Sequence, residues 1–159
     1  MRMTLVVCSL AASVAFAQAA KPGLVVAPLE VDPAPVLTKS ELAFRNAFFD
    51  VVDRKSGAYV ASKPEAEAAL TKTARQDFRE SDESLSKFAE KAHTLYALHA
   101  WMQTGPKKTL VLTGRAVRDD GKLMKSATVT CAMGAKPVDT VKALTEELLS
   151  QLDIGSYPT

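Results

Sequence analysis

The hydrophobic pattern changes its period along the chain, and the change predicts how the protein is built. In most of the first half, apolar residues recur at spacings of three and four, as in helices that lie on a core. From about residue 109 to residue 133 they alternate with polar residues, as in half-buried strands. The last segment returns to helical spacing. Helices that each bury one face against a sheet satisfy this succession within one α/β domain.

The first half predicts two strands and three helices. Residues 24–31 form a β-branched apolar run with a proline near its end, which predicts a buried strand. The capping box Thr38-x-x-Glu41 predicts a helix that runs to about Arg54. Residues 58–61 are a short strand candidate. The apolar arc of the predicted helix carries Phe44, Phe48, Val51 and Val52.

Two more helix starts follow. Ser62-x-x-Glu65 is a second capping box, with Pro64 in the first turn, where its missing N–H costs little. Residues 75–81 are polar and predict a loop. Ser81 is placed to cap the next helix. That helix carries Leu85, Phe88, Ala89 and Ala92 at helical spacing.

The second half predicts an antiparallel meander and a closing helix. Residues 95–103, 109–118 and 123–133 read as strands, and the turn signature of residues 119–122 joins the last two. Alternation places Val129, Cys131 and Met133 inward. Pro137 opens the last helix, whose apolar positions are Val138, Val141, Leu144, Leu148 and Leu152.

The predicted element order is therefore β-α-β-α-α-β-β-β-α. It implies a mixed, largely antiparallel sheet of about four to five strands, packed with about three to four helices.

The N-terminus has the anatomy of a cleaved secretory signal. Arg2 precedes a short uncharged run that ends in small residues, and this run is too short to span a membrane. We expect cleavage between Ala17 and Gln18, with a site before Ala20 as the alternative. Residues 1–17 are then the signal and residues 18–159 a single globular domain, with no transmembrane segment after signal removal. The protein would be periplasmic or secreted.

Composition and charge narrow the class of protein further. The chain is 47% hydrophobic and 24% charged, with a formal net charge of +2. Such values suit an ordinary folded domain and exclude a disordered chain. The absence of a strong basic field makes nucleic acid an unexpected partner.

Few residues are suited to catalysis or metal binding. The histidines are His93 and His99, without metal-ligand spacing, and loss of the signal removes Cys8 and leaves Cys131 as the one thiol. Its inward position predicts a buried, structural cysteine without an internal disulfide. We therefore expect no enzyme, cofactor or metal. An unrecognised activity that uses His93, His99 or Cys131 stays open as an alternative.

A binding surface is the stronger expectation. Tyr96, His99 and Trp101 could share an exposed sheet face, with Arg115 or Arg118 across from them, and aromatic residues and arginine are enriched at binding hot spots. For Trp101, the single tryptophan, packing beneath a helix is nevertheless the favoured expectation, and the exposed face is the alternative.

The chain resembles the TolB amino-terminal-domain-like group of bacterial envelope proteins, which includes curli-secretion-type and penicillin-binding-protein-activator-type domains. The similarity rests on an opening strand at residues 24–29, a first helix at 37–52, a helix leading into a strand at 85–98, and a final hairpin at 110–133. It covers most of residues 22–152. The resemblance implies an α/β domain that makes protein contacts in the envelope without catalysis, and it carries over no functional residues.

The favoured function is an exported, non-catalytic envelope module that binds a protein partner, through an exposed sheet edge or the face that carries Trp101. The alternative is a binder of a small ligand or an envelope polymer, held in a pocket between helices and sheet.

Overall fold

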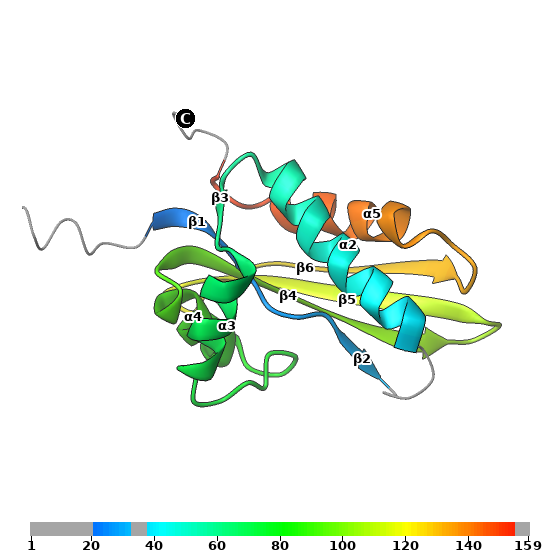
Figure 1. The fold of residues 1–159 in the computed structure, drawn as a ribbon, viewed down its shortest axis with the longest axis horizontal. Helices are drawn as coiled ribbons and strands as arrows, with labels where there is room; N and C mark the ends of the chain where they lie inside the picture. Colours follow the sequence, from blue (N-terminus) through cyan, green and yellow to red (C-terminus); the bar gives the residue numbers. More distant parts are fainter. Residues whose placement is uncertain (1–20, 33–37, 155–159) are drawn as a thin grey trace, which may run out of the picture.

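The structure, a computed structural model, describes residues 21–32 and 38–154 (Figure 1). The helices are α2 (Thr38–Ser56), α3 (Lys63–Thr71), α4 (Asp82–Lys91) and α5 (Pro137–Leu149). The strands are β1 (Lys21–Val26), β2 (Glu30–Asp32), β3 (Tyr59–Val60), β4 (Thr94–Gly105), β5 (Thr109–Arg118) and β6 (Leu123–Ala132). The predicted order is confirmed, apart from one extra strand near the start.

A single mixed sheet organises these elements. Its strand order is β3-β1-β4-β5-β6, and β2 pairs with β4 farther along the same side as β1. The pairings of β1 with β3, of β1 with β4 and of β2 with β4 are parallel. The long strands β4, β5 and β6 pair antiparallel, which confirms the predicted meander.

The predicted first strand is in fact two strands, which is a correction with a physical reason. Pro28 lacks an N–H and cannot donate to a ladder, so the strand breaks there. Between Val26 and Glu30 the chain advances one residue more than β4 does between their partners, Leu98 and Trp101. Because side chains alternate along a strand, one extra residue turns the next side chains to the opposite face of the sheet.

The helices cover the two faces of the sheet unequally. In Figure 1, α2 and α5 lie along one face, whereas α3 and α4 gather over one end of the other. The larger core joins α2 and α5 to β1, β4 and β5, and includes Phe44, Phe48, Val51, Val141, Leu144 and Leu148. The smaller core joins α3 and α4 to the other face through Ala66, Phe78, Leu85, Phe88, Ala97 and Val117.

A glycine lets α5 approach the sheet closely. A Cβ at Gly114, in the middle of β5, would lie 2.7 Å from a side-chain carbon of Leu148 and 3.3 Å from one of Leu144. Glycine weakens a strand interior, so its presence here marks the place where helix and strand backbones come together.

The predicted apolar faces are confirmed for α2 and α4, and need correction near β6. Met133 lies past the end of β6 and is 40% exposed, and Val138 in the first turn of α5 is 47% exposed. Cys131 is half-buried rather than buried, because β6 is the last strand of the sheet. Leu152 lies beyond the end of α5 and is also half-buried.

Two helix caps are confirmed. The Ser62 hydroxyl accepts from the Glu65 N–H at 3.3 Å, and the Glu65 carboxylate accepts from the Ser62 N–H at 2.8 Å. The Ser81 hydroxyl accepts from the Ser84 N–H at 3.1 Å. The predicted signal and its cleavage site, Ala17 and Gln18, lie outside the described residues, as do the side chains of the first capping box. Among the described residues, no helix has both the length and the apolar character to cross a membrane.

Candidate functional site

The structure divides the predicted group Tyr96, His99 and Trp101 between the two faces of the sheet. Tyr96 points into the core beneath α2 and α5, where its hydroxyl accepts from the Asp153 N–H at 3.2 Å. His99 and Trp101 point to the opposite face, since odd and even residues of a strand alternate. His99 has no exposed surface. The expectation that these three side chains share an exposed face is therefore wrong for Tyr96 and His99.

The two predicted arginines also separate. Arg115 lies directly across from His99 in the β4–β5 ladder and belongs to the same polar region. Arg118 pairs instead with Asp120 in the turn, with 2.5 Å between its Nη2 and the carboxylate Oδ2. The hydrogen bond from Arg118 lowers the pKa of Asp120 to about 2. Arg118 thus serves the hairpin turn rather than the region around Trp101.

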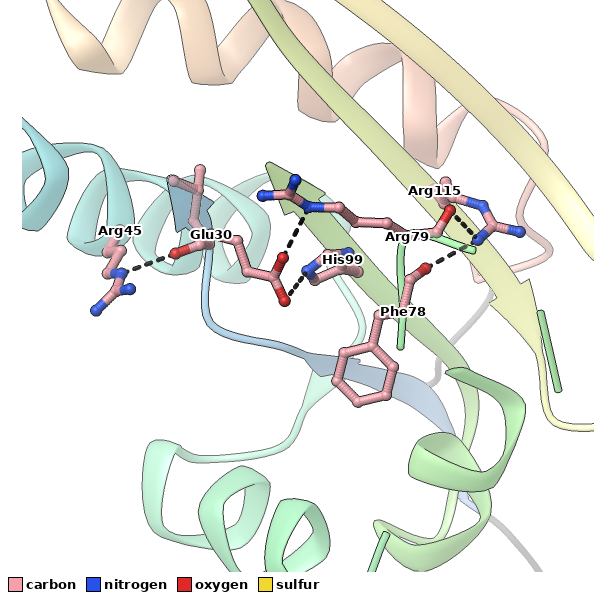
Figure 2. A network of polar contacts seen from close by, with 7 residues as sticks. Glu30, Arg45, Phe78, Arg79, His99 and Arg115 are labelled. Atoms are coloured by element: carbon pink, nitrogen blue, oxygen red, sulfur yellow. Dashed lines mark hydrogen bonds and ion pairs between the residues drawn. The ribbon is translucent and has the colours of Figure 1, made fainter. Parts of the chain in front are cut away.

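A carboxylate from β2 forms the centre of that polar region (Figure 2). The Glu30 carboxylate lies 3.4 Å from Nε2 of His99 and 2.8 Å from Nε of Arg79. The His99 imidazole, and after it the Arg79 guanidinium, hold the pKa of Glu30 below its ordinary value, while partial burial acts in the opposite direction. Glu30 reaches His99 because the extra residue near Pro28 turns its side chain to this face.

Arg115 fixes the loop before α4 to the sheet. Its Nη1 donates to the backbone carbonyls of Phe78 at 2.8 Å and Arg79 at 3.0 Å, as Figure 2 shows. Its Nη2 forms an ion pair with Asp82 in the first turn of α4. Burial lowers the pKa of Arg115 from its ordinary value. One side chain of β5 therefore holds both the loop and the start of the helix.

A row of stacked rings leads from the smaller core to the surface. Phe88 stacks on Phe78, and Phe78 meets His99 edge-on, each pair with centroids 5.4 Å apart. His99 in turn stacks on Trp101 at 5.6 Å. The guanidinium of Arg79 lies 5.7 Å from the Trp101 ring centroid. Trp101 is half-buried and ends the row, so its orientation is fixed by the layers behind it.

Past Trp101, no helix of the described residues covers the same face of the sheet. We call this surface the open sheet face. The Thr113 and Thr128 hydroxyls lie 3.4 Å apart across β5 and β6. The side chains from β6 are exposed, and those from β4 and β5 are half-buried. The open sheet face consists of Trp101, Val111, Thr113, Ser126, Thr128 and Thr130.

The ionic and aromatic contacts hold Trp101 and the loop before α4 in place on the sheet. A His–Glu pair has the groups needed for proton transfer, but His99 has no surface through which a substrate would reach it in this structure. His93 is exposed at the end of α4, and Cys131 lies half-buried in β6. The described residues contain no group of three or more side chains that could hold a metal ion.

An apolar cleft lies between α2 and α3, beside the connection from β1 to β2. It measures about 190 Å³. Lys63 closes one side, with its Nζ 5.2 Å from the Phe49 ring centroid. Its apolar lining includes Val26, Pro28, Leu42, Phe49 and Leu70. A pocket between helices and sheet, as the sequence suggested, is therefore present but small.

Most residues of the polar region around Glu30 and His99 could not be identified from the sequence. Glu30, Phe78, Arg79 and Asp82 all contribute to it, and none stood out in the sequence. The one available signal was Pro28, which marks where the first strand breaks. A break in the strand, however, does not by itself predict toward which face of the sheet the Glu30 side chain points.

Comparison with family models and with curated protein sequences gave no match. Solved structures do match. The NMR structure of E. coli LpoB aligns with a TM-score of 0.53 and 14% identity, over 70% of this chain and 58% of that one. Lipoprotein GNA1162 from Neisseria meningitidis aligns with a TM-score of 0.50 and 18% identity, over 71% and 81%. The LpoB C-terminal domain from Salmonella enterica aligns with a TM-score of 0.48 and 13% identity, over 72% and 84%.

This chain shares the fold of LpoB and lipoprotein GNA1162. It spans 58% of the length of the E. coli LpoB structure. At these identities the likeness is one of fold, and it confirms the α/β architecture that the resemblance implied. Assignment to the TolB amino-terminal-domain-like group stays a prediction.

Proposed function

We propose that the protein is an exported, non-catalytic module of the bacterial cell envelope that binds a protein partner through the open sheet face. The observation that carries the proposal is Trp101, a half-exposed aromatic ring held in place by His99 and Arg79 at the margin of the open sheet face. The fold shared with a lipoprotein supports an envelope role. The resemblance to TolB amino-terminal-domain-like proteins points the same way.

The chemistry of the open sheet face suits a protein partner. The neighbours of Trp101 in β5 and β6 are uncharged, and the charges beside it, on Arg79 and Glu30, are already paired with each other, so its burial need not leave a charge unpaired. Because the rings and ions behind Trp101 already fix its orientation, little side-chain entropy is lost on binding. Glu30 and Arg115 therefore act as positioning residues, since they hold the neighbours of Trp101 in place.

Export is the second part of the proposal. Removal of residues 1–17 would leave residues 18–159 as the mature domain in the periplasm or outside the cell. Cys131, half-buried on the last strand, would then be its one thiol.

The test is capture of the partner by the tagged mature protein in intact cells, after chemical crosslinking. We expect Trp101→Ala to reduce recovery of the partner at least about tenfold, as for a hot-spot aromatic residue. Trp101→Phe should retain part of the recovery. The control is Leu42→Ala, which truncates another large apolar side chain, 61% exposed on α2. Equal recovery with Trp101→Ala and the native protein would contradict the proposal.

A second candidate function rests on the apolar cleft between α2 and α3. At about 190 Å³ it is smaller than most pockets for drug-sized ligands, so it would take only a small apolar group. A ligand that binds there would raise the melting temperature, because it stabilises the native state by mass action. Leu42→Ala would weaken that shift and Trp101→Ala would not, which separates this candidate from the first.

A further inference from the structure

The last strand of the sheet, β6, has a long edge that lacks the usual protection against pairing with another strand. β6 is ten residues long, and no strand lies beyond it among the described residues. Proteins usually protect such edges with short strands, prolines or charges. The opposite edge follows this rule, since β3 has two residues and β2 has three. β6 has no proline, and Lys125 is its single charge.

The register shows which backbone groups β6 presents at this edge. The Met133 N–H donates to the Lys108 carbonyl at 3.1 Å, and Thr109 pairs with Ala132. In an antiparallel ladder, residues that bond to the neighbouring strand alternate with residues whose N–H and C=O point away. The outward-pointing groups therefore belong to Ser126, Thr128, Thr130 and Ala132.

The sequence of β6 is complementary to itself when reversed about Thr128. In an antiparallel pair centred there, Ser126 would face Thr130 and Ala127 would face Val129. Lys125 would face Cys131, so no like charges would be opposed. Within its own chain, the Lys125 Nζ already lies 3.7 Å from a Glu147 carboxylate oxygen. Within β6 itself, a second copy of the chain therefore brings no like charges opposite each other.

Exposed apolar side chains lie at both ends of the same edge. Leu123 at the start of β6 is 42% exposed, and Met133 just past its end is 40% exposed. Val138 follows in the first turn of α5 and is 47% exposed. An antiparallel two-fold arrangement brings the start of each β6 to the end of the other, so the pairing would bury these side chains.

We propose that β6 pairs antiparallel with β6 of a second copy of this chain, about a two-fold axis near Thr128. The pairing would add about six backbone hydrogen bonds and form one continuous sheet from two chains. It would also join the two open sheet faces, so that both Trp101 side chains lie on one extended surface. The inference goes beyond the proposed function and does not depend on it.

The first experiment measures the molar mass of the mature protein by analytical ultracentrifugation at up to about 100 µM, a range that detects weak association. We expect a dimer that dissociates on dilution. Thr128→Pro removes an outward-pointing N–H and should give a monomer. Thr128→Ser keeps the N–H and should stay a dimer. A native protein that is monomeric throughout this range would overturn the proposal, as would a dimer that survives in folded Thr128→Pro.

A second experiment keeps the proposal testable if Thr128→Pro does not fold. In a Cys131→Ser background, Thr128→Cys places one thiol beside the two-fold axis, and Asp53→Cys places one on the exposed side of α2. A short bismaleimide should join two copies of the Thr128→Cys variant at least about tenfold faster than two copies of the Asp53→Cys variant, because only the former thiols are held near each other. Equal rates would overturn the pairing. Both experiments use the purified protein alone, so their outcome is independent of partner binding.

Discussion

The two faces of the sheet differ in how far helices cover them and in the contacts that hold those helices in place. On one face, α2 and α5 lie along the long strands over an apolar core in which Phe48, Val52 and Leu144 are fully or almost fully buried. On the other face, α3 and α4 cover only one end, and an ionic cluster joins a loop and β2 to the strands. The first face therefore holds the larger apolar core and should supply most of the stability, whereas on the second face ionic contacts hold the loop before α4 and β2 to the long strands.

The largest effect is expected from a substitution that creates a cavity in the core of the first face. Phe48→Ala removes a side chain that is 1% exposed and should lower the free energy of unfolding by about 3–5 kcal/mol. Leu42→Ala on the exposed side of the same helix should change it by less than about 0.5 kcal/mol. Urea denaturation measures both values. A loss below about 1 kcal/mol for Phe48→Ala would show that this core is not the main source of stability.

On the second face, the largest effect is expected at Arg115. Arg115→Ala leaves the Phe78 and Arg79 carbonyls and the Asp82 carboxylate without their donor, and should cost about 2–3 kcal/mol. Hydrogen exchange should show faster exchange in residues 75–85 than in α5. Arg115→Lys keeps the positive charge but lacks the guanidinium that donates to several acceptors at once. Most of the loss of stability should therefore remain in this variant. Unchanged exchange in the loop would contradict its attachment by Arg115.

Glu30 gives a smaller, pH-dependent effect. Its folded-state pKa is lowered, so its interactions stabilise the protein above the unfolded-state pKa of about 4.3 and are lost as the pH falls through the folded-state value. Glu30→Gln should therefore be less stable than the native protein at pH 7, with a difference that shrinks below about pH 4. Denaturation at several pH values measures this difference. A gap that stays constant across this range would show that the ionised carboxylate is not the source of the effect.

The smallest effect belongs to the turn between β5 and β6. Asp120 should titrate at about 2 in an NMR pH titration, because it accepts hydrogen bonds from Arg118 and from the Lys122 N–H. Arg118→Gln should return the pKa of Asp120 toward its ordinary value and leave partner binding unchanged. Since Arg118 lies outside the Trp101 region, a loss of binding in this variant would extend the surface to the turn.

The sequence predicted the elements better than the site, for physical reasons. Helical period and caps such as Ser62 and Ser81 act locally, so they placed the helices well. The turn after Arg118 and the alternation that follows it placed the hairpin. The site depends on long-range geometry: one extra residue near Pro28 turns Glu30 toward His99, and Arg115 binds carbonyls 36 and 37 positions earlier in the chain. No local pattern contains that information.

Grouping Tyr96 with His99 and Trp101 failed for a simpler reason. Residues separated by an odd number of positions on a strand point to opposite faces, and Tyr96 is three positions before His99. The pairing register of β4 with β5 would have shown that Arg115 lies directly across from His99. That register depends on the turn that joins the two strands, so it is known only once the structure of the turn is known.

The most direct test of the account is site-specific photocrosslinking in living cells. A photoreactive amino acid in place of Thr113 lies on the open sheet face, and one in place of Lys142 lies on the exposed side of α5. We expect the probe at Thr113 to trap a single envelope protein, and the yield to fall in the Trp101→Ala background. The probe at Lys142 should trap none of it. Equal trapping from both positions, or trapping at Thr113 that Trp101→Ala does not reduce, would contradict the claim that the open sheet face is the binding surface.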